Sequence, residues 1–244
     1  MIEINFSVDE EFLDVIPHPV PAKKMVPKWY KNMSQYVQKD KPHPMILDED
    51  DGKSIVNLTM KACIPIRDTL LSGYIIPLVS DLRAFHSSEE QGWTFHWSPR
   101  YDYHLNELIS THSVDQIKKS PLEKLSSNGT LFKLHNPWRI KTKPGYSCMF
   151  YSLPYHDHPF EILPGIVDTD GIHEVNFPFV WKPESGEYML KKGLPFAYVL
   201  PFKREEYKHT VTKSDKKVLD NRRISATHMG FWYRDFVHKK KKYD

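Results

Sequence analysis

The chain has 244 residues, which is long enough to bury a core without disulfides, so a disulfide-stapled miniprotein is excluded. A hydrophobic fraction of 40%, a charged fraction of 27% and only 10 glycines also exclude the collagen-like, coiled-coil and fully disordered classes. The 34 lysines and arginines nearly balance the 31 aspartates and glutamates, and this balance argues against nucleic acid as a partner, since nucleic-acid-binding proteins usually show a basic face.

The cysteines and the N-terminal segment bear on the cellular location. Cys63 and Cys148 lie in apolar runs without a Cys-x-x-Cys motif, so we expect both to be reduced thiols in the core. The opening segment MIEINFSVDEEF lacks the basic region and apolar run of a leader, and no segment has the ~18 apolar residues of a membrane span. We therefore expect a cytoplasmic protein that has no membrane partner.

Short strands are expected to predominate, because 19 prolines and 13 each of tyrosine and phenylalanine are spread along the chain. Residues 1–129 are expected to wrap the core as mixed short helices and strands. The expected elements are a strand at 2–6, a short helix from Pro27 with Trp29, Tyr30 and Met33 near one face, a helical turn at 65–71 ended by Gly73, a strand at 74–85, and a half-buried strand containing Trp93, Phe95 and Trp97.

Residues 130–202 form the predicted β core, in which turn residues separate six apolar segments. These segments are 131–134, 138–141, 146–151, 175–181, 188–190 and 196–202. Residues 203–244 are expected to add one or two helices after Ser214 and to end in a solvated tail at Lys239 to Lys242. The alternative for these four lysines is contact with nucleic acid, lipid head groups or a capsid surface. The predicted fold is a single mainly β (α+β) domain with short helices at the N- and C-termini.

Part of the predicted core carries motifs in a familiar order. Pro144-Gly145-Tyr146 opens a strand, Gly165 begins a G-I-V-D-x-D turn, a strand ends at Trp181, and Gly193 begins a G-x-x-F-A-x-V-L strand. This order resembles the core of the deoxyuridine triphosphatase family, which implies a β-clip or jelly-roll-like sandwich. Gly165 and Gly193 are expected where a turn needs positive φ or a close backbone approach.

The same resemblance implies candidate catalytic residues and also exposes gaps. Asp168 matches the family aspartate that orients a water and holds the deoxyribose, and Asp170 is the second acid of the motif. However, Gly171 replaces the aromatic residue that stacks under the sugar, and the segment from Ser152 to Tyr155 replaces the phosphate-binding Pro-Arg-Ser-Gly motif. The family's glycine-rich C-terminal arm is also missing. The resemblance thus implies a scaffold without its phosphate site. Because the family places its sites between subunits, the resemblance also implies a homo-oligomer, with a trimer as the candidate form.

A second resemblance covers most of the chain. The segments IPHPVPAKKMVPKWYKNM, CIPIRDTLLSGYIIPL, GIVDTDG, VNFPFVW and PFAYVLPFKRE are similar to an uncharacterised family found in phages and bacteria. This resemblance implies a phage-type protein, located in the host cytoplasm or the virion, whose partners are other phage or host proteins.

Two alternative chemistries remain open. Asp168 and Asp170 could bind Mg²⁺ in a deoxynucleotide pyrophosphatase, or cap a turn by accepting backbone N–H bonds. His156, His158 and Glu161 resemble half of a cupin motif for Fe²⁺ or Zn²⁺, with His173 or His209 as a further ligand; the competing interpretation is an exposed loop between prolines.

The aromatic residues of the predicted core could stack on a ligand, with Tyr146 and Trp181 as the candidates, although alternation along strands assigns most of them to the core. This aromatic set is Tyr146, Phe150, Phe177, Phe179, Trp181 and Phe196. Together with the residues, the two resemblances imply a non-catalytic binding or structural module of phage type, without a cofactor, on a triphosphatase-like scaffold that lacks the phosphate-binding motifs. The alternatives are the Mg²⁺-dependent pyrophosphatase and the cupin-like metalloenzyme.

Overall fold

The computed structural model describes residues 2–36, 58–87, 92–98, 107–125, 130–217, 220 and 233–243. The chain divides into two compact units. Unit 1 comprises Met1–Met25 with Gly73–Glu206, and unit 2 comprises Val26–Ser72 with Tyr207–Asp244. The single domain expected from the sequence stays a prediction, and each unit is described by itself.

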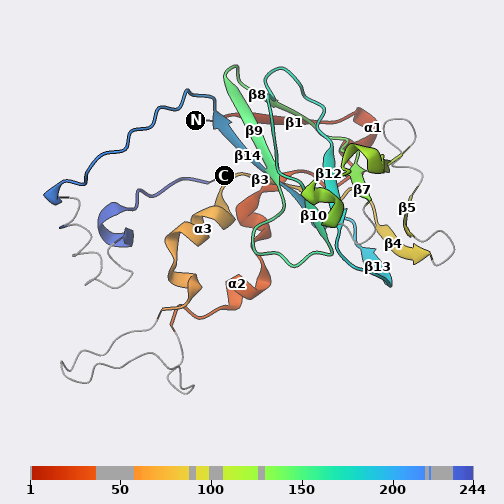
Figure 1. Ribbon diagram of the computed structural model, residues 1–244, viewed down its shortest axis with the longest axis horizontal. Helices are drawn as coiled ribbons and strands as arrows, with labels where there is room; N and C mark the ends of the chain where they lie inside the picture. Colours follow the sequence, from red (N-terminus) through yellow and green to blue (C-terminus); the bar gives the residue numbers. More distant parts are fainter. Residues whose placement is uncertain are drawn as a thin grey trace. The chain divides into compact units, whose positions relative to one another are not determined.

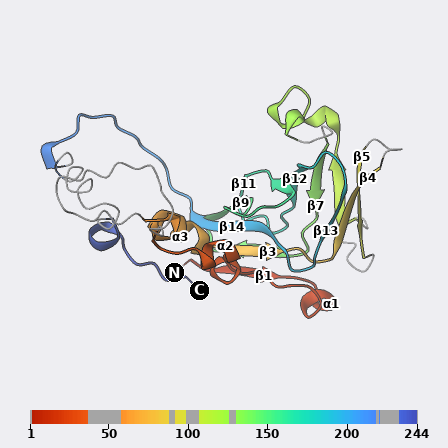
Figure 2. The same ribbon diagram turned by 90° about the horizontal axis from the view of Figure 1, so that it is seen from below.

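The described residues of unit 1 form four antiparallel sheets (Figure 1). The largest has the strand order β11-β9-β14-β3-β2, and Figure 2 shows β9, β14 and β3 following one another across it. Its strands are β11 (Gly165–Val167), β9 (Tyr146–Tyr151), β14 (Pro195–Lys203), β3 (Tyr74–Pro77) and β2 (Val20–Pro21). The long strand β14 pairs with β9 on one side and β3 on the other, and so joins both halves of the chain in one sheet.

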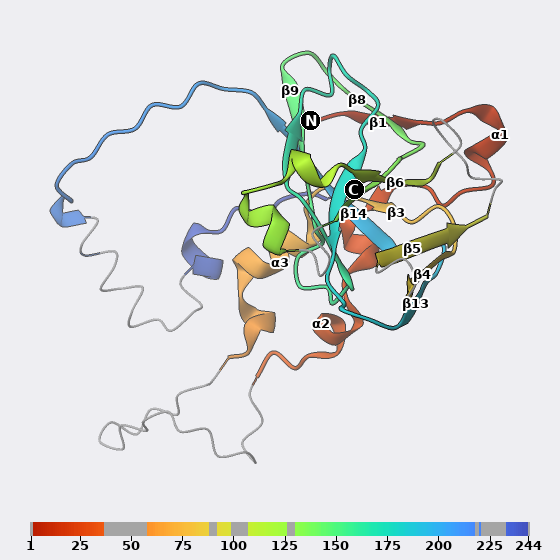
Figure 3. The same ribbon diagram turned by 45° about the vertical axis from the view of Figure 1, so that its right-hand side comes forward.

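The other three sheets share the core with this one. The four-stranded sheet has β10 (Phe160–Ile162), β12 (Phe177–Trp181), β7 (Leu131–Leu134) and β6 (Ile109–His112) in that order. The three-stranded sheet has β13 (Glu187–Leu190), β4 (Leu82–Ser87) and β5 (Gly92–Trp97), which lie side by side in Figure 3. The two-stranded sheet pairs β1 (Ile4–Ser7) with β8 (Arg139–Thr142).

Aromatic side chains from different sheets meet in one core, which makes unit 1 sandwich-like. Phe196 of β14 stacks on Phe160 of β10 with ring centroids 4.6 Å apart, and Phe95 of β5 lies 4.7 Å from Phe132 of β7. Burial of these rings removes large apolar areas from water, which is the main favourable contribution to folding. The mainly β fold predicted from the sequence is therefore confirmed.

The predicted strands are largely present, with differences at tight turns. The segment 74–85 is not one strand but two, β3 and β4, because the chain turns at the buried Ser80 between them. The three-residue strands β10 and β11 were not predicted, since so few residues carry no clear alternation. The predicted strand containing Trp93, Phe95 and Trp97 is confirmed as β5.

Two glycines behave differently from expectation. Gly193 has φ +86, as predicted for a turn, but Gly165 lies in β11 without a positive φ, and a Cβ built there would meet nothing within 4 Å. The requirement for glycine at position 165 was therefore wrong. Gly73 is the more constrained residue, because its φ is +71 and a Cβ there would collide with the carbonyl oxygen of Val199.

The helical elements are short. Unit 1 contains α1 (Glu10–Leu13) and 3-10 turns at Ala22–Met25, Val114–Gln116 and Pro121–Lys124. Unit 2 contains α2 (Lys28–Asn32), a 3-10 turn at Met60–Ala62, α3 (Ile64–Leu71) and a π-helical turn at Tyr233–Val237. Most of the helix expected after Ser214 falls on residues outside the described ranges. None of the helices among the described residues has the length and apolar composition that a membrane span requires.

Candidate functional site

The acidic motif lies in a tight turn that follows β11. The carbonyl oxygen of Asp168 accepts hydrogen bonds from the backbone N–H groups of Gly171 and Ile172 at 2.9 and 3.0 Å. Between the two acids, the buried Thr169 exchanges a 2.8 Å hydroxyl hydrogen bond with Thr142. These contacts fix the turn, so that both carboxylates are presented next to the neighbouring strands β9 and β14.

Arg204, the first residue after β14, pairs with both carboxylates. Its guanidinium donates to Asp170 in a bidentate arrangement, with Nη1–Oδ1 at 2.9 Å and Nη2–Oδ2 at 2.5 Å. Nη1 also lies 3.1 Å from Oδ1 of Asp168. Bidentate contacts of this kind are among the stronger hydrogen bonds in proteins. We call this group the Arg204 cluster. Its members are Asp168, Asp170, Arg204, Gly145 and Ser147.

The beginning of β9 and the residue before it supply further contacts of the Arg204 cluster. The hydroxyl of Ser147 donates to Asp168 Oδ1 at 2.6 Å, and the backbone N–H of Gly145 donates to Asp170 Oδ2 at 2.8 Å. Arg204 itself donates from Nη1 to the carbonyl oxygen of Tyr146 at 3.2 Å. The turn-capping interpretation of Asp170 is thus confirmed in part, although the N–H it accepts comes from a different turn.

The two aspartates differ in exposure. The side chain of Asp170 is only 15% exposed, whereas that of Asp168 is 65% exposed. Hydrogen bonds from Arg204 and from the Gly145 backbone lower the pKa of Asp170 to about 2. Arg204 in turn has a raised pKa because Asp170 accepts its hydrogen bonds. The guanidinium therefore occupies the position next to both carboxylates that a divalent cation would need.

Arg204 was not among the candidates drawn from the sequence. It lies 34 residues beyond Asp170, and only the order β11-β9-β14 brings the two together. The one available signal was its position two residues after the apolar segment 196–202 of the predicted core, where a charged side chain can lie at the end of a strand.

The candidate metal ligands are not gathered. His156 and His158 lie in the loop between β9 and β10 with ring centroids 5.6 Å apart, whereas Glu161 is the exposed middle residue of β10 between two buried neighbours. His173 is hydrogen-bonded to the carbonyl oxygen of Thr169 through Nδ1. No group of three or more His, Cys, Asp or Glu side chains suited to a metal ion occurs among the residues that the structure describes. The interpretation of this segment as a loop is confirmed, but the loop is not fully exposed, because His156 and His158 are both partly buried.

His158 is nevertheless an unusual histidine. Its ring stacks on Phe160 with centroids 5.0 Å apart, and its buried Nε2 has no hydrogen-bond partner within the described ranges. Burial, together with the charges of His156 and Lys182, lowers the pKa of His158 to about 4, although Asp157 opposes this shift. The ring is therefore neutral at physiological pH.

This neutral ring makes the fold sensitive to acid. The unfolded chain takes up a proton at His158 near its ordinary pKa of 6.5, but the folded protein resists protonation down to a pKa of about 4, so stability should fall as pH drops through this interval. Thermal unfolding between pH 7 and pH 4 checks this expectation. A His158→Phe variant, which keeps the stacking on Phe160, should lose part of this dependence of stability on pH. His209→Gln, at an exposed position, should keep all of it. The same change of melting temperature with pH in the wild type and both variants would contradict the argument.

The two candidate ligand-binding aromatics occupy different environments. Trp181 is fully buried, and its ring centroid lies 5.4 Å from that of Trp93 and 5.3 Å from that of Phe95. It is therefore a core residue that offers no surface to a ligand. Tyr146 is half-buried at the beginning of β9, beside the Arg204 cluster. The assignment of most of the aromatic set to the core is confirmed.

The basic tail and one cysteine also differ from expectation. Lys241 donates from Nζ to Oδ2 of Asp68 at 2.5 Å, and His238 Nε2 lies 3.2 Å from the same oxygen. Burial raises the pKa of Asp68, but the hydrogen bonds and charges of Lys241 and His238 outweigh it, so the pKa is lowered. Lys241 is thus not a free tail residue, because it neutralises a buried carboxylate. Cys148 is buried as predicted, whereas Cys63 is only partly buried.

A comparison with models of known protein families and a search of curated proteins found no match to this chain.

Proposed function

We propose that this protein is a non-catalytic binding or structural module rather than an enzyme. The observation that carries the proposal is the bidentate pairing of Arg204 with Asp170, together with its 3.1 Å contact to Asp168. A Mg²⁺-dependent hydrolase needs carboxylates available to the metal. A guanidinium at this distance competes with Mg²⁺ for the same oxygens and repels it.

The missing phosphate-binding motif supports the same proposal. A triphosphate needs several cations or backbone N–H groups around it. The segment from Ser152 to Tyr155 supplies no arginine. The phage-type role, the self-association as a trimer and the location in host cytoplasm or virion belong to this proposal as well, and they rest on the two resemblances.

A phosphate-release assay tests the proposal. The full chain is incubated with each deoxynucleoside triphosphate and Mg²⁺, and pyrophosphate and phosphate are measured against a deoxyuridine triphosphatase as positive control. We expect no release above the protein-free blank. Release that disappears in Asp168→Asn would overturn the proposal. This variant keeps the bidentate pair of Asp170 and Arg204, so a loss of activity in it reports chemistry rather than unfolding.

A further inference from the structure

The near-neutral balance of the whole chain conceals a strong division of charge between the two units. Unit 2 contains 18 lysines and arginines against 10 aspartates and glutamates, a net charge of +8. Unit 1 contains 16 against 21, a net charge of −5. Charge asymmetry of this size between parts of one chain is typical of proteins that bind polyanions.

The positive charge of unit 2 is presented to solvent. Every residue from 207 to 217 is exposed, including Lys208, Lys213, Lys216 and Lys217. Lys239, Lys240 and Lys242 are also exposed. Two acids of the same unit are already neutralised, since Asp68 pairs with Lys241 and His238, and Asp235 pairs with Arg234. Asp215 is the one acid within 207–217 and 239–242, so the exposed lysines of these described segments outnumber it.

Aromatic rings accompany these lysines on the surface. Tyr207 is 92% exposed and directly precedes Lys208, and Phe236 is 72% exposed three residues before Lys239. Exposed rings next to cationic side chains are the combination that binds single-stranded nucleic acid, because the rings stack on bases while the lysines contact phosphates. A membrane surface would instead favour an amphipathic helix with an apolar face, and residues 207–215 are not helical.

We infer that unit 2 binds single-stranded nucleic acid through residues 207–217 and 239–242. Tyr207 stacks on a base, and the lysines of these two segments neutralise phosphates, except Lys241, which pairs with Asp68. This inference rests on the proposed binding role and names its partner class. It replaces the expectation, drawn from the whole-chain balance, that nucleic acid is not a partner.

The test measures binding of the full chain to a fluorescein-labelled oligothymidylate of about 20 nucleotides, longer than a typical single-strand site. Fluorescence anisotropy is recorded over a series of salt concentrations. In the quadruple variant Lys208→Gln, Lys213→Gln, Lys216→Gln and Lys217→Gln, we expect the Kd to rise at least about tenfold and the salt slope to fall by about 3, since each phosphate contact contributes about 0.7. Tyr207→Ala should raise the Kd about tenfold without a change in the slope.

The control removes the same charge from unit 1. Lys24, Lys118, Lys124 and Lys141 are exposed there, and replacing all four with glutamine should leave the Kd within about twofold. An equal loss in both quadruple variants, equal affinity for a duplex of the same length, or binding to phosphatidylserine vesicles but not to the oligonucleotide would each overturn the inference. Failure here would leave the non-catalytic role standing, because the phosphate-release assay decides that role separately.

Discussion

Replacing Phe196 with alanine should lower the free energy of unfolding by about 3–5 kcal/mol, the usual cost of truncating a buried aromatic residue. Phe196 is fully buried in β14. The centroid of its ring lies 4.6, 5.7 and 6.4 Å from the ring centroids of Phe160, Phe179 and Phe177, respectively. Those three residues belong to the facing four-stranded sheet. Removing the ring would therefore open a cavity between the two sheets. Because protein interiors are closely packed, the neighbouring side chains could fill this cavity only if the sheets moved.

Urea denaturation monitored by circular dichroism measures this loss. Ile166→Ala is the matched control, because Ile166 lies in the same five-stranded sheet but is 63% exposed, and its free energy of unfolding should change by no more than about 0.5 kcal/mol. Phe196→Leu should fall between the two variants. A cost below about 1 kcal/mol for Phe196→Ala would show that the two sheets do not pack as described.

Arg204→Met should give the next largest effect, because it removes the cation that pairs with both Asp168 and Asp170. Asp170, only 15% exposed, would keep its negative charge with backbone N–H groups as its remaining hydrogen-bond donors, among them that of Gly145. We expect the melting temperature at pH 7 to fall by several degrees, and the pKa of Asp170 to rise from its low value of about 2. Asp170→Asn in the same background should restore part of the loss, since it removes the unpaired charge.

The pH dependence separates this ion pair from general damage. A carboxylate with a folded pKa of about 2 and an ordinary pKa of 3.8 stabilises the fold above pH 3.8, and this contribution disappears as pH falls toward 2. The difference in melting temperature between wild type and Arg204→Met should therefore be largest at neutral pH and shrink below about pH 3. A difference that does not depend on pH would refute the role of the ion pair.

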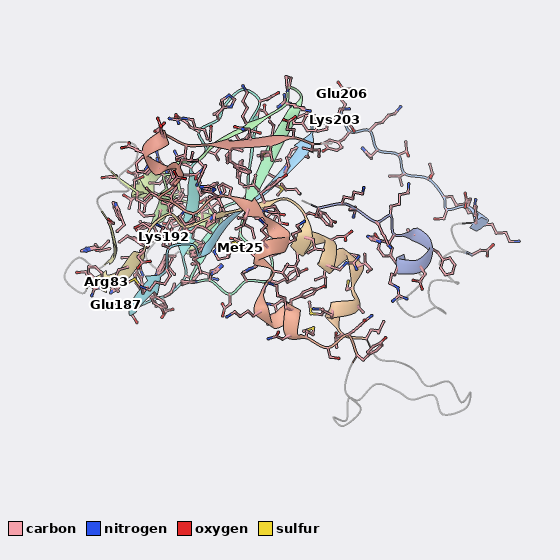
Figure 4. All side chains as sticks on the ribbon, turned by 180° about the vertical axis from the view of Figure 1, so that it is seen from behind. Met25, Arg83, Glu187, Lys192, Lys203 and Glu206 are labelled. Carbon is pink, nitrogen blue, oxygen red and sulfur yellow. The ribbon has the colours of Figure 1, made fainter. Side chains whose placement is uncertain are left out.

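Arg83→Met is a suitable control. Arg83 makes a similar two-bond contact with Glu187, at 2.8 and 3.2 Å, but both side chains are about half exposed. In Figure 4 this pair lies at the opposite end of unit 1 from Lys203 and Glu206, which flank the Arg204 position. Because exposed ion pairs contribute little, Arg83→Met should leave the melting temperature nearly unchanged.

Several features of unit 1 could be predicted because they depend on neighbours in the chain. Alternation of aromatic and polar residues predicted the strand at Trp93, Phe95 and Trp97, since successive side chains of a strand point to opposite faces. The loop containing His156 and His158 followed from the prolines on either side of it. The missing phosphate-binding residues were also evident in the sequence, and they led to the proposal of a module without catalytic activity.

Features that depend on distant residues could not be predicted. The pairing of Arg204 with Asp170 requires the register of β9 against β11 and β14, and the pairing of Lys241 with Asp68 joins residues 173 positions apart. The division of charge between the units became visible only once contacts assigned residues 207–244 to the same unit as 26–72. Composition and alternation are properties of the chain itself, so the sequence shows them directly. Ion pairs and charged surfaces depend on strand order and packing, because these bring remote segments together.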